Sequence, residues 1–212
     1  MKSQPVELVT ISGDDITIAA AAWYSTDQAV TEARRKRVPA LLQTLAQGDP
    51  PEGLPHSVPA EHTLLTFRVT SDISTHIHML KHRIGVSVSS QSQRYMELRE
   101  DLYYVPDDWP AEMQVDFAAT VEPLFDAYHD FIKRLEAYGI DRKRAKESAR
   151  LVLPYATQIH YLVTFNLLSF IHFQSLRNTD HAQDEIQLIA AEMLRLVKDS
   201  GRFENALKAW NL

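Results

Sequence analysis

The segment from Pro110 to Tyr138 constrains the fold most, because it is the longest stretch of the chain with one repeating pattern. Its apolar residues recur with the spacing of an amphipathic helix, which packs one face on a core and leaves the other in water. Gly139 follows directly and favours a helix end. Pro123 lies inside the segment, at a position where a proline can bend a helix. The sequence therefore predicts one long amphipathic helix here.

Other segments share the helical pattern, and their ends carry recognisable signals. Pro39 is expected to kink or restart the helix in which it lies. Asp72 is expected to cap a helix that runs through Arg83, and Asp180 is expected to cap another. The further predicted helices are Asp15–Tyr24, Asp27–Gln47, Asp141–Leu153, Asn166–Arg177 and Asp180–Lys198.

Three short segments alternate between apolar and polar residues, as half-buried strands do. They are Val6–Ile11, His62–Val69 and Gln158–Phe165. Gly48–Pro59 is rich in Gly and Pro and predicts a loop. Together these patterns predict an α+β fold, a helix-rich single domain over residues 1–212 with a small antiparallel or mixed sheet.

Composition excludes several classes of function. The 212 residues carry a net charge of -6, which argues against general nucleic-acid binding. No signal peptide and no apolar run of membrane-spanning length is visible, so we expect a soluble cytoplasmic protein with no membrane partner. The chain contains 0 cysteines, which removes disulfides, thiolate metal sites and thiol nucleophiles.

A cationic cluster brackets a loop that is rich in serine and glutamine. Lys81-His82-Arg83 precedes the loop Ile84–Gln91, and Ser92-Gln93-Arg94-Tyr95 follows it. Guanidinium groups bind phosphate in a bidentate fashion, and serine hydroxyls can satisfy further phosphate oxygens. The cluster suits an anionic, planar ligand such as a nucleotide; the alternative is a solvated loop. The basic run Arg34-Arg35-Lys36-Arg37 is interpreted as a solvated helix face.

Histidines form two more groups. His56 and His62 end a Pro-containing loop, where they could contact a planar cofactor or be ordinary surface residues. His76, His78 and His82 lie close in sequence, and the last two share a helix face, as metal-binding pairs do. No third ligand and no His-Glu-x-x-His pattern accompanies them, so the sequence predicts no metal site.

These motifs, in this order, resemble the flavin-dependent thymidylate synthases over roughly residues 6 to 200. The family signature is an Arg-His-Arg triplet, a short loop and Ser-x-Arg-Tyr, which Lys81-His82-Arg83 and Ser92-Gln93-Arg94-Tyr95 match in part. The other segments that carry the resemblance are His56 with Pro59 and Glu61-His62, Ala149–Pro154, Thr164–Asn166, Leu176-Arg177, His181–Gln183 and Glu185-Ile186.

The resemblance implies the family's fold, a homotetramer with active sites built from several subunits, and a reaction without a cysteine nucleophile. It implies FAD as cofactor, methylenetetrahydrofolate as one-carbon donor and NADPH as reductant, for the C5-methylation of a uridylate nucleotide. His56 and His82 would contact the flavin, and Asn166 and His172 its adenine or ribose. The full set of implied cofactor contacts is Ser25, His56, Lys81, His82, Arg83, Asn166 and His172.

By the same resemblance, Ser92, Arg94 and Arg150 would hold the nucleotide phosphate, and Arg177 would contact a pyrimidine carbonyl. Arg177 and His56 are the implied catalytic residues. The remaining implied nucleotide contacts are His78, Ser90 and Gln91.

The chain departs from the family pattern at cofactor and nucleotide contacts. The triplet begins with Lys81, which is a point charge in place of a bidentate fork. The loop before Ser92 is one residue longer than usual, and Ser89-Ser90 replaces an Asn-Glu pair. Smaller side chains leave room for a ribose 2′-hydroxyl, which favours UMP, as in a nucleoside-antibiotic pathway, while dUMP stays open. Transfer of another one-carbon group, such as hydroxymethyl, and a non-catalytic nucleotide-binding role also stay open.

Overall fold

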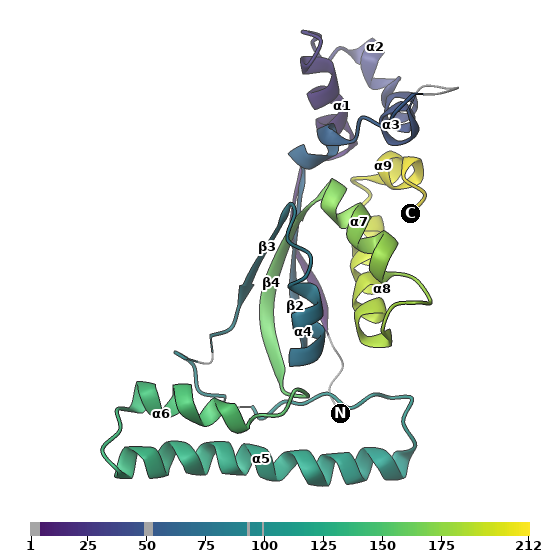
Figure 1. The fold of residues 1–212 in the computed structure, drawn as a ribbon. Helices are drawn as coiled ribbons and strands as arrows, with labels where there is room; N and C mark the ends of the chain where they lie inside the picture. Colours follow the sequence, from purple (N-terminus) through teal and green to yellow (C-terminus); the bar gives the residue numbers. More distant parts are fainter. Residues whose placement is uncertain (1–4, 49–52, 93, 99) are drawn as a thin grey trace. The chain divides into compact units, whose positions relative to one another are not determined.

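The computed structural model describes residues 5–48, 53–92, 94–98 and 100–212. Its sheet has four strands in the order β1-β2-β4-β3. Along the chain, helices lie between these strands and after the last one (Figure 1). The strands are β1 (Val6–Ser12), β2 (Leu64–Asp72), β3 (Val86–Ser90) and β4 (Gln158–Asn166). The predicted small sheet in a helix-rich α+β fold is therefore confirmed.

Neighbouring strands of the sheet are antiparallel. β1 pairs with β2 in this sense. Thr66 bonds Thr164 at 2.9 Å and Thr70 bonds His160 at 2.7 Å between side chains. Because residue numbers rise along β2 while they fall along β4, these two strands also run in opposite directions.

The helices lie close to most of the expected positions. They are α1 (Asp15–Tyr24), α2 (Glu32–Arg35), α3 (Val38–Gln47), α4 (Ile73–Met79), α5 (Ala111–Ala137), α6 (Arg142–Ala149), α7 (Leu167–Arg177), α8 (Asp184–Asp199) and α9 (Glu204–Ala209), with short 3₁₀ turns η1 (Val58–His62) and η2 (Arg150–Val152). No helix in the described segments is both long and apolar enough to cross a membrane.

The chain divides into two compact units, and the division falls within β2, β3 and β4. The first unit contains Pro5, Thr70–Met79 and Ser89–Tyr161. The second contains Val6–Val69, Leu80–Val88 and Leu162–Leu212.

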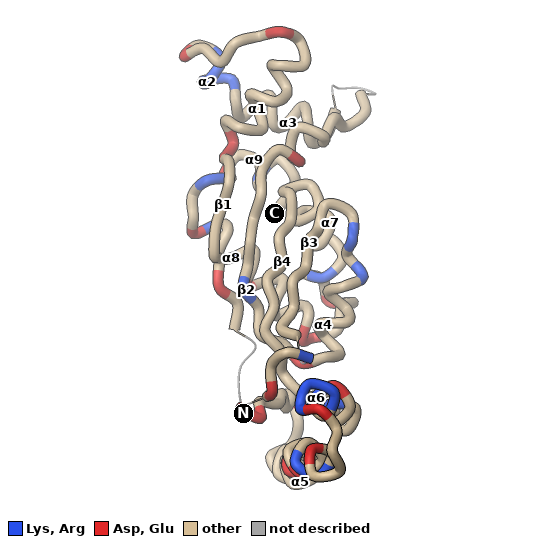
Figure 2. Tube along the Cα trace, turned by 90° about the vertical axis from the view of Figure 1, so that its left-hand side faces the viewer, with Lys and Arg blue, Asp and Glu red and all other residues tan. Residues whose placement is uncertain are grey.

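The core of the first unit forms along the predicted long helix. Val121, Phe125, Tyr128 and Ile132 of α5 are buried at helical spacing and pack with residues of α6. This stripe is the apolar face that the sequence pattern predicts. Pro123 lies within the helix. Figure 2 shows basic and acidic residues along α6, and Arg142 of this helix pairs with Glu97 and Glu136.

Aromatic packing holds the sheet of the second unit against α7. The rings of Phe67 in β2 and Phe170 in α7 stack with centroids 5.8 Å apart, and Phe165 and Phe173 extend the cluster. The start of α9 is fixed from far away in sequence, because the buried carboxylate of Asp15 accepts hydrogen bonds from the backbone N–H groups of Asn205 and Ala206. These bonds satisfy helix-terminal donors that would otherwise be unpaired.

Some expected helices differ from the observed ones in their bounds. The segment Asp27–Gln47 is helical only from Glu32 and is divided into α2 and α3, with Pro39 in the first turn of α3. The prediction that Pro39 restarts the helix is thus confirmed. α8 begins at Asp184 with Gln183 as its N-cap residue, so the prediction that Asp180 caps it was wrong.

The region after Asp72 was only partly predicted. The Asp72 carboxylate accepts a hydrogen bond from the backbone N–H of Thr75 at 2.9 Å, as a cap should. The helix nevertheless ends at Met79 and does not reach Arg83. The expected loop Ile84–Gln91 contains β3, whose pairing with β4 is a long-range interaction. The sequence also gave no indication of α9.

Candidate functional site

Within the second unit, the loop that follows α4 is fixed to the start of α7. The carbonyl of Gly85 accepts a bond from the backbone N–H of Asn166 at 3.0 Å, and the carbonyl of Ile84 accepts one from the Ser169 hydroxyl at 2.7 Å. Gly85 has φ +63, and a Cβ there would lie 2.4 Å from Asn166 Nδ2. Glycine is therefore required for this close approach.

This packing places His82 beside the last turn of α7. Arg177 Nε donates a hydrogen bond to His82 Nε2 at 3.0 Å, and the His82 ring meets the Phe173 ring edge-on with centroids 5.0 Å apart. In this contact Nε2 is the acceptor, which corresponds to the tautomer that carries its proton on Nδ1. His82, the predicted flavin contact, and Arg177, the predicted pyrimidine contact, are thus joined by a hydrogen bond.

Four more of the sequence-predicted cofactor residues lie in the same unit. Asn166 caps α7, because its side-chain oxygen accepts a bond from the backbone N–H of Ser169 at 2.8 Å. His172 is an exposed residue of α7. Lys81 and Arg83 are exposed on the loop. A ligand can therefore reach Lys81, Arg83 and His172, which are exposed, and Asn166 is half-buried.

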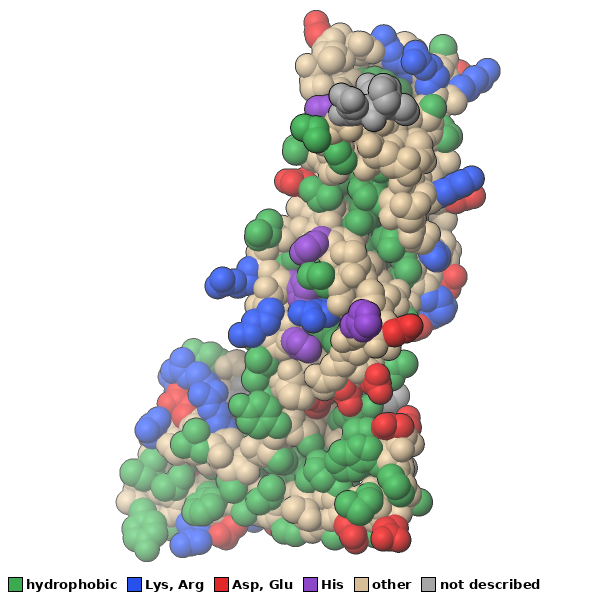
Figure 3. Space-filling model, turned by 45° about the vertical axis from the view of Figure 1, so that its right-hand side comes forward, with side chains coloured by type: hydrophobic (Ala, Val, Ile, Leu, Met, Phe, Trp, Pro, Cys, Tyr) green, Lys and Arg blue, Asp and Glu red, His purple; other side chains and the backbone are tan. Residues whose placement is uncertain are grey.

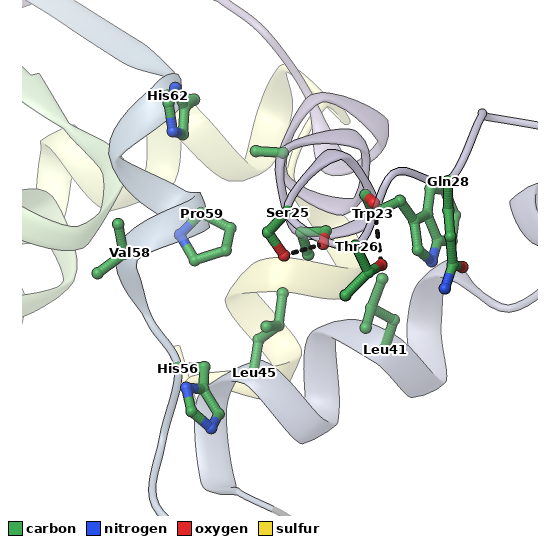
Figure 4. Close-up of a pocket in the computed structure, with 12 residues that line it drawn as sticks. Trp23, Ser25, Thr26, Gln28, Leu41, Leu45, His56, Val58, Pro59 and His62 are labelled. Atoms are coloured by element: carbon green, nitrogen blue, oxygen red, sulfur yellow. Dashed lines mark hydrogen bonds between the residues drawn. The ribbon is translucent and has the colours of Figure 1, made fainter.

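A cavity of about 520 Å³ lies between the end of α1, α3 and the segment around η1. Figure 4 shows Ser25, Pro59, His56 and Leu45 arranged around it. The Ser25 hydroxyl donates a bond to the Ala22 carbonyl at 2.7 Å. The cavity is lined by Ala21, Ala22, Trp23, Ser25, Thr26, Gln28, Leu41, Leu45, His56, Val58, Pro59 and His62.

The lining is mainly apolar, with a few hydroxyl, amide and imidazole groups. Such a surface suits a flat, partly polar ligand. The structure brings together Ser25 and His56, two predicted flavin contacts that are far apart in sequence, and adds His62. The other predicted cofactor residues do not line this cavity.

In the first unit, the chain turns directly after β3. The carbonyl of Ser92 accepts bonds from the backbone N–H groups of Tyr95 and Met96, and Arg94 projects from this turn. Arg94 Nε pairs with Glu147 Oε1 at 2.8 Å, and its guanidinium lies 5.8 Å from the Tyr95 ring centroid. The hydrogen bond and the positive charge of Arg94 lower the pKa of the Glu147 carboxyl.

Glu147 was missed in the sequence, where nothing marks it among the many charges of α6. Arg150 lies at the C-terminal end of α6, and its guanidinium makes no hydrogen bond or ion pair with any residue that the structure describes. The two arginines among the predicted phosphate contacts therefore differ: Arg94 has a carboxylate partner, whereas Arg150 has none among the described residues.

Two further predicted nucleotide contacts lie at the end of β3. His76 Nε2 and the Ser90 hydroxyl are 2.6 Å apart. His76 is 8% exposed, and burial lowers its pKa. The backbone N–H of Gln91 donates to the His160 carbonyl at 2.8 Å, which fixes the chain after Ser90. The sequence grouped His76 with possible metal ligands, but in the described part of the chain no three His, Asp or Glu residues form a metal site.

Comparison with known proteins gives the family. The family model described as "Thymidylate synthase complementing protein" matches residues 7–200. A flavin-dependent thymidylate synthase of Pseudothermotoga lettingae is 31% identical over 200 residues, which cover 91% of this chain and 84% of that protein. One from Mycobacterium avium is 35% identical over 149 residues, or 66% of this chain and 59% of that relative's length. The chain belongs to the family of flavin-dependent thymidylate synthases.

Solved structures agree with this assignment. The UMP/dUMP methylase PolB of Streptomyces cacaoi, in a crystal structure with 5-Br UMP, superposes with a TM-score of 0.76 at 26% identity. The match covers 100% of this chain and 95% of that chain. The structure of the same protein with 5-Br dUMP gives a TM-score of 0.75 at 25% identity. The resemblance inferred from the motifs is therefore confirmed at the level of family and fold.

Proposed function

We propose that this chain is a flavin-dependent methylase that transfers a one-carbon unit from methylenetetrahydrofolate to C5 of UMP or dUMP. The observation that supports this most is the full-length likeness to a UMP/dUMP methylase, in a chain whose family relatives are flavin-dependent thymidylate synthases. NADPH would serve as the reductant. Residues 1–212 would act as one such domain, as the family match over 7–200 suggests.

The second unit would hold FAD. Reduced FAD, when bound, would supply the hydride that completes the methyl group. Ser25 and His56 line a cavity of fitting size and polarity, so these residues fit a flat ring with polar edges. His82 would contact the flavin through its face or its Nδ1–H, while Lys81 and Arg83 would neutralise phosphate charge.

Arg177 would orient the pyrimidine. Its Nε is already bonded to His82, so its two terminal nitrogens remain to donate to a carbonyl oxygen. Donation to a carbonyl draws electron density toward that oxygen and fixes the ring. Because Arg177 and His82 share a hydrogen bond, the pyrimidine and flavin contacts would be positioned together.

The first unit would bind the nucleotide phosphate through Ser92, Arg94 and Arg150. Two guanidinium groups match the charge of a phosphate dianion, and a serine hydroxyl can donate to a third oxygen. Arg94 is held by Glu147, so phosphate would bind beside this carboxylate or displace it. His78 and Gln91 are proposed to lie along the same nucleotide.

The reaction would proceed without a covalent bond between the protein and the nucleotide. The chain contains 0 cysteines. The serines of β3 and of the turn that follows it are proposed to act as hydrogen-bonding groups, since a hydroxyl needs a positioned base to become a nucleophile.

A homotetramer is proposed from the family. α5 and its flanking turns leave several large apolar side chains exposed, and Figure 3 shows hydrophobic side chains gathered densely over the part of the molecule where Figure 1 draws α5 and α6. Exposed apolar surface of this kind is typical of subunit interfaces. The residues are Met113, Val115, Phe131 and Tyr138.

The mass of the product tests the proposed function. The purified protein is incubated with FAD, methylenetetrahydrofolate, NADPH and either UMP or dUMP, and the nucleotides are analysed by mass spectrometry. A product that gains one methyl group supports the proposal. A hydroxymethyl product would indicate a different group transfer, and no product from either nucleotide, in a protein that binds them, would indicate a non-catalytic homologue.

A further inference from the structure

We infer that His76 is a positioning residue that fixes the hydroxyl of Ser90 for recognition of the nucleotide sugar. This inference rests on the proposed function, because it assumes that Ser92 and Arg94 bind the phosphate. It assigns to His76 a role in the choice between UMP and dUMP that its position in the sequence does not suggest.

The contact joins a fixed side chain to an exposed one. His76 lies on α4 and is 8% exposed, while Ser90 is an exposed residue at the end of β3. The His76 Nε2 and Ser90 Oγ atoms are 2.6 Å apart. Because the imidazole is buried and the serine is exposed, a ligand can reach the Ser90 hydroxyl rather than the His76 ring.

The imidazole cannot easily move. Its ring meets the ring of Tyr161 on β4 edge-on, with centroids 4.7 Å apart, and the Tyr161 hydroxyl in turn bonds the buried Ser71 at 3.3 Å. An exposed serine alone would populate several χ1 rotamers. A bond to a fixed ring selects one of them, so the Ser90 oxygen has a defined position before any ligand binds.

The chemistry that remains on Ser90 suits another hydroxyl. Burial lowers the pKa of His76 and so favours the neutral imidazole, whose Nε2 either accepts from Ser90 or donates to it, according to the tautomer. A serine hydroxyl has one donor and two acceptor positions, and His76 occupies only one. A ribose 2′-hydroxyl can donate or accept, so it can hydrogen-bond the Ser90 hydroxyl with either tautomer of His76. The 2′-CH₂ of dUMP can form this hydrogen bond with neither.

The position along the chain is also suitable. Ser90 is the last residue of β3 and precedes the proposed phosphate ligand Ser92 by two residues, which span at most roughly 7 Å of chain. This reach is comparable with the span from a 5′-phosphate to the hydroxyl edge of its own sugar. One nucleotide can therefore meet Ser92 with its phosphate and Ser90 with its sugar.

The test is a double-mutant cycle on nucleotide preference. His76→Phe keeps a ring against Tyr161 but removes the hydrogen bond, and Ser90→Ala removes the hydroxyl. For both single variants and the double variant, kcat/KM and the equilibrium Kd are measured with UMP and with dUMP. Each single change should lower the ratio of kcat/KM for UMP to kcat/KM for dUMP by roughly 3- to 10-fold, the effect of one hydrogen bond. The double variant should be no worse than Ser90→Ala.

Ser74→Ala is the matched control, because it removes a different side-chain bond of α4, the one to Asp72. It should not change the UMP to dUMP ratio. The inference is overturned if His76→Phe weakens both nucleotides equally, if Ser74→Ala shifts the ratio as much, or if the effects of His76→Phe and Ser90→Ala multiply independently.

Failure of the proposed function gives a different result. If no variant and no wild-type preparation forms product, the methylase proposal fails. The Kd values then decide this inference alone: a preference for UMP that both single variants lose supports it, and equal binding of the two nucleotides by every variant overturns it.

Discussion

Individual side chains in this protein act in pairs, and the pairs define what each residue can do. Arg177 is bonded to His82, Arg94 to Glu147, and His76 contacts Ser90. In each pair, at least one member was assigned to a ligand from sequence. The partner limits its orientation or its protonation, which leads to predictions for single substitutions.

Arg177→Ala is expected to raise the nucleotide KM or to reduce turnover roughly 10- to 100-fold, because a charge-assisted hydrogen bond contributes about 1.5–3 kcal/mol. FAD should remain bound. Steady-state kinetics and the flavin absorbance of the purified variant measure both effects. Arg195→Ala is the control, since Arg195 pairs only with carboxylates of its own helix. Wild-type kinetics in Arg177→Ala would show that the pyrimidine site is misplaced.

Arg94→Ala is expected to raise the KM for the nucleotide by a similar factor, because it removes one cation from the proposed phosphate site. Arg142→Ala is the matched control in the same unit: it is also an exposed arginine paired with carboxylates, Glu97 and Glu136. If the two variants have the same nucleotide KM, Arg94 is an ordinary surface charge and does not bind the phosphate.

His76 should make the stability of the fold depend on pH. In the folded protein, burial lowers the pKa of His76 below its ordinary value of 6.5. The unfolded state therefore binds a proton at this residue more readily than the folded state does. Stability from this group is present above about pH 6.5 and is lost as pH falls. The drop in Tm between about pH 7.5 and about pH 5.5 should be smaller in His76→Phe than in the wild type. An equal drop in both proteins would contradict this.

At the scale of the elements, one glycine connects the loop after α4 to α7. Gly85→Ala would place a Cβ 2.2 Å from the Ser169 hydroxyl oxygen, at a residue with φ +63. We expect destabilisation of about 1–3 kcal/mol from the strained backbone and the displaced loop, together with weaker flavin retention, because His82 lies on this loop. Chemical denaturation and flavin titration measure the two losses.

Gly201→Ala separates the two causes of that loss. Gly201 has a similar φ, +66, but a Cβ there would meet nothing within 4 Å. It should therefore show the backbone cost alone and retain flavin as the wild type does. Equal flavin loss in both variants would mean that the packing of Gly85 on α7 does not position the site.

For the whole molecule, the predicted homotetramer has a functional test. Arg94 and Arg177 belong to different compact units, and the proposed homotetramer would build each active site from several subunits. When the weakened Arg94→Ala and Arg177→Ala proteins are mixed and allowed to exchange subunits, the activity should therefore exceed the mean of the two separate variants, because some sites would receive Arg94 from one chain and Arg177 from another. Light scattering should give the mass of four chains. No activity above that mean in exchanged tetramers would indicate sites made within single chains.

Elements whose signal is local could be predicted from the amino-acid sequence alone. The apolar spacing of Val121, Phe125, Tyr128 and Ile132 is sufficient to predict α5, since a helix repeats its buried face every few residues. The cap at Asp72 depends on a neighbour three residues away and was also predictable. The order of the motifs was sufficient to predict the family, because the short segments follow one another as they do in the family, whose model matches residues 7–200.

Features that depend on distant partners become visible only in the folded chain. β3 forms because it pairs with β4, although its own sequence suggests a loop, and α9 starts where Asp15 supplies a cap from the other end of the chain. Glu147 and His76 carry no local signal of their own. Their roles arise because folding brings them to Arg94 and Ser90, and such contacts are set by packing that no periodicity in the sequence encodes.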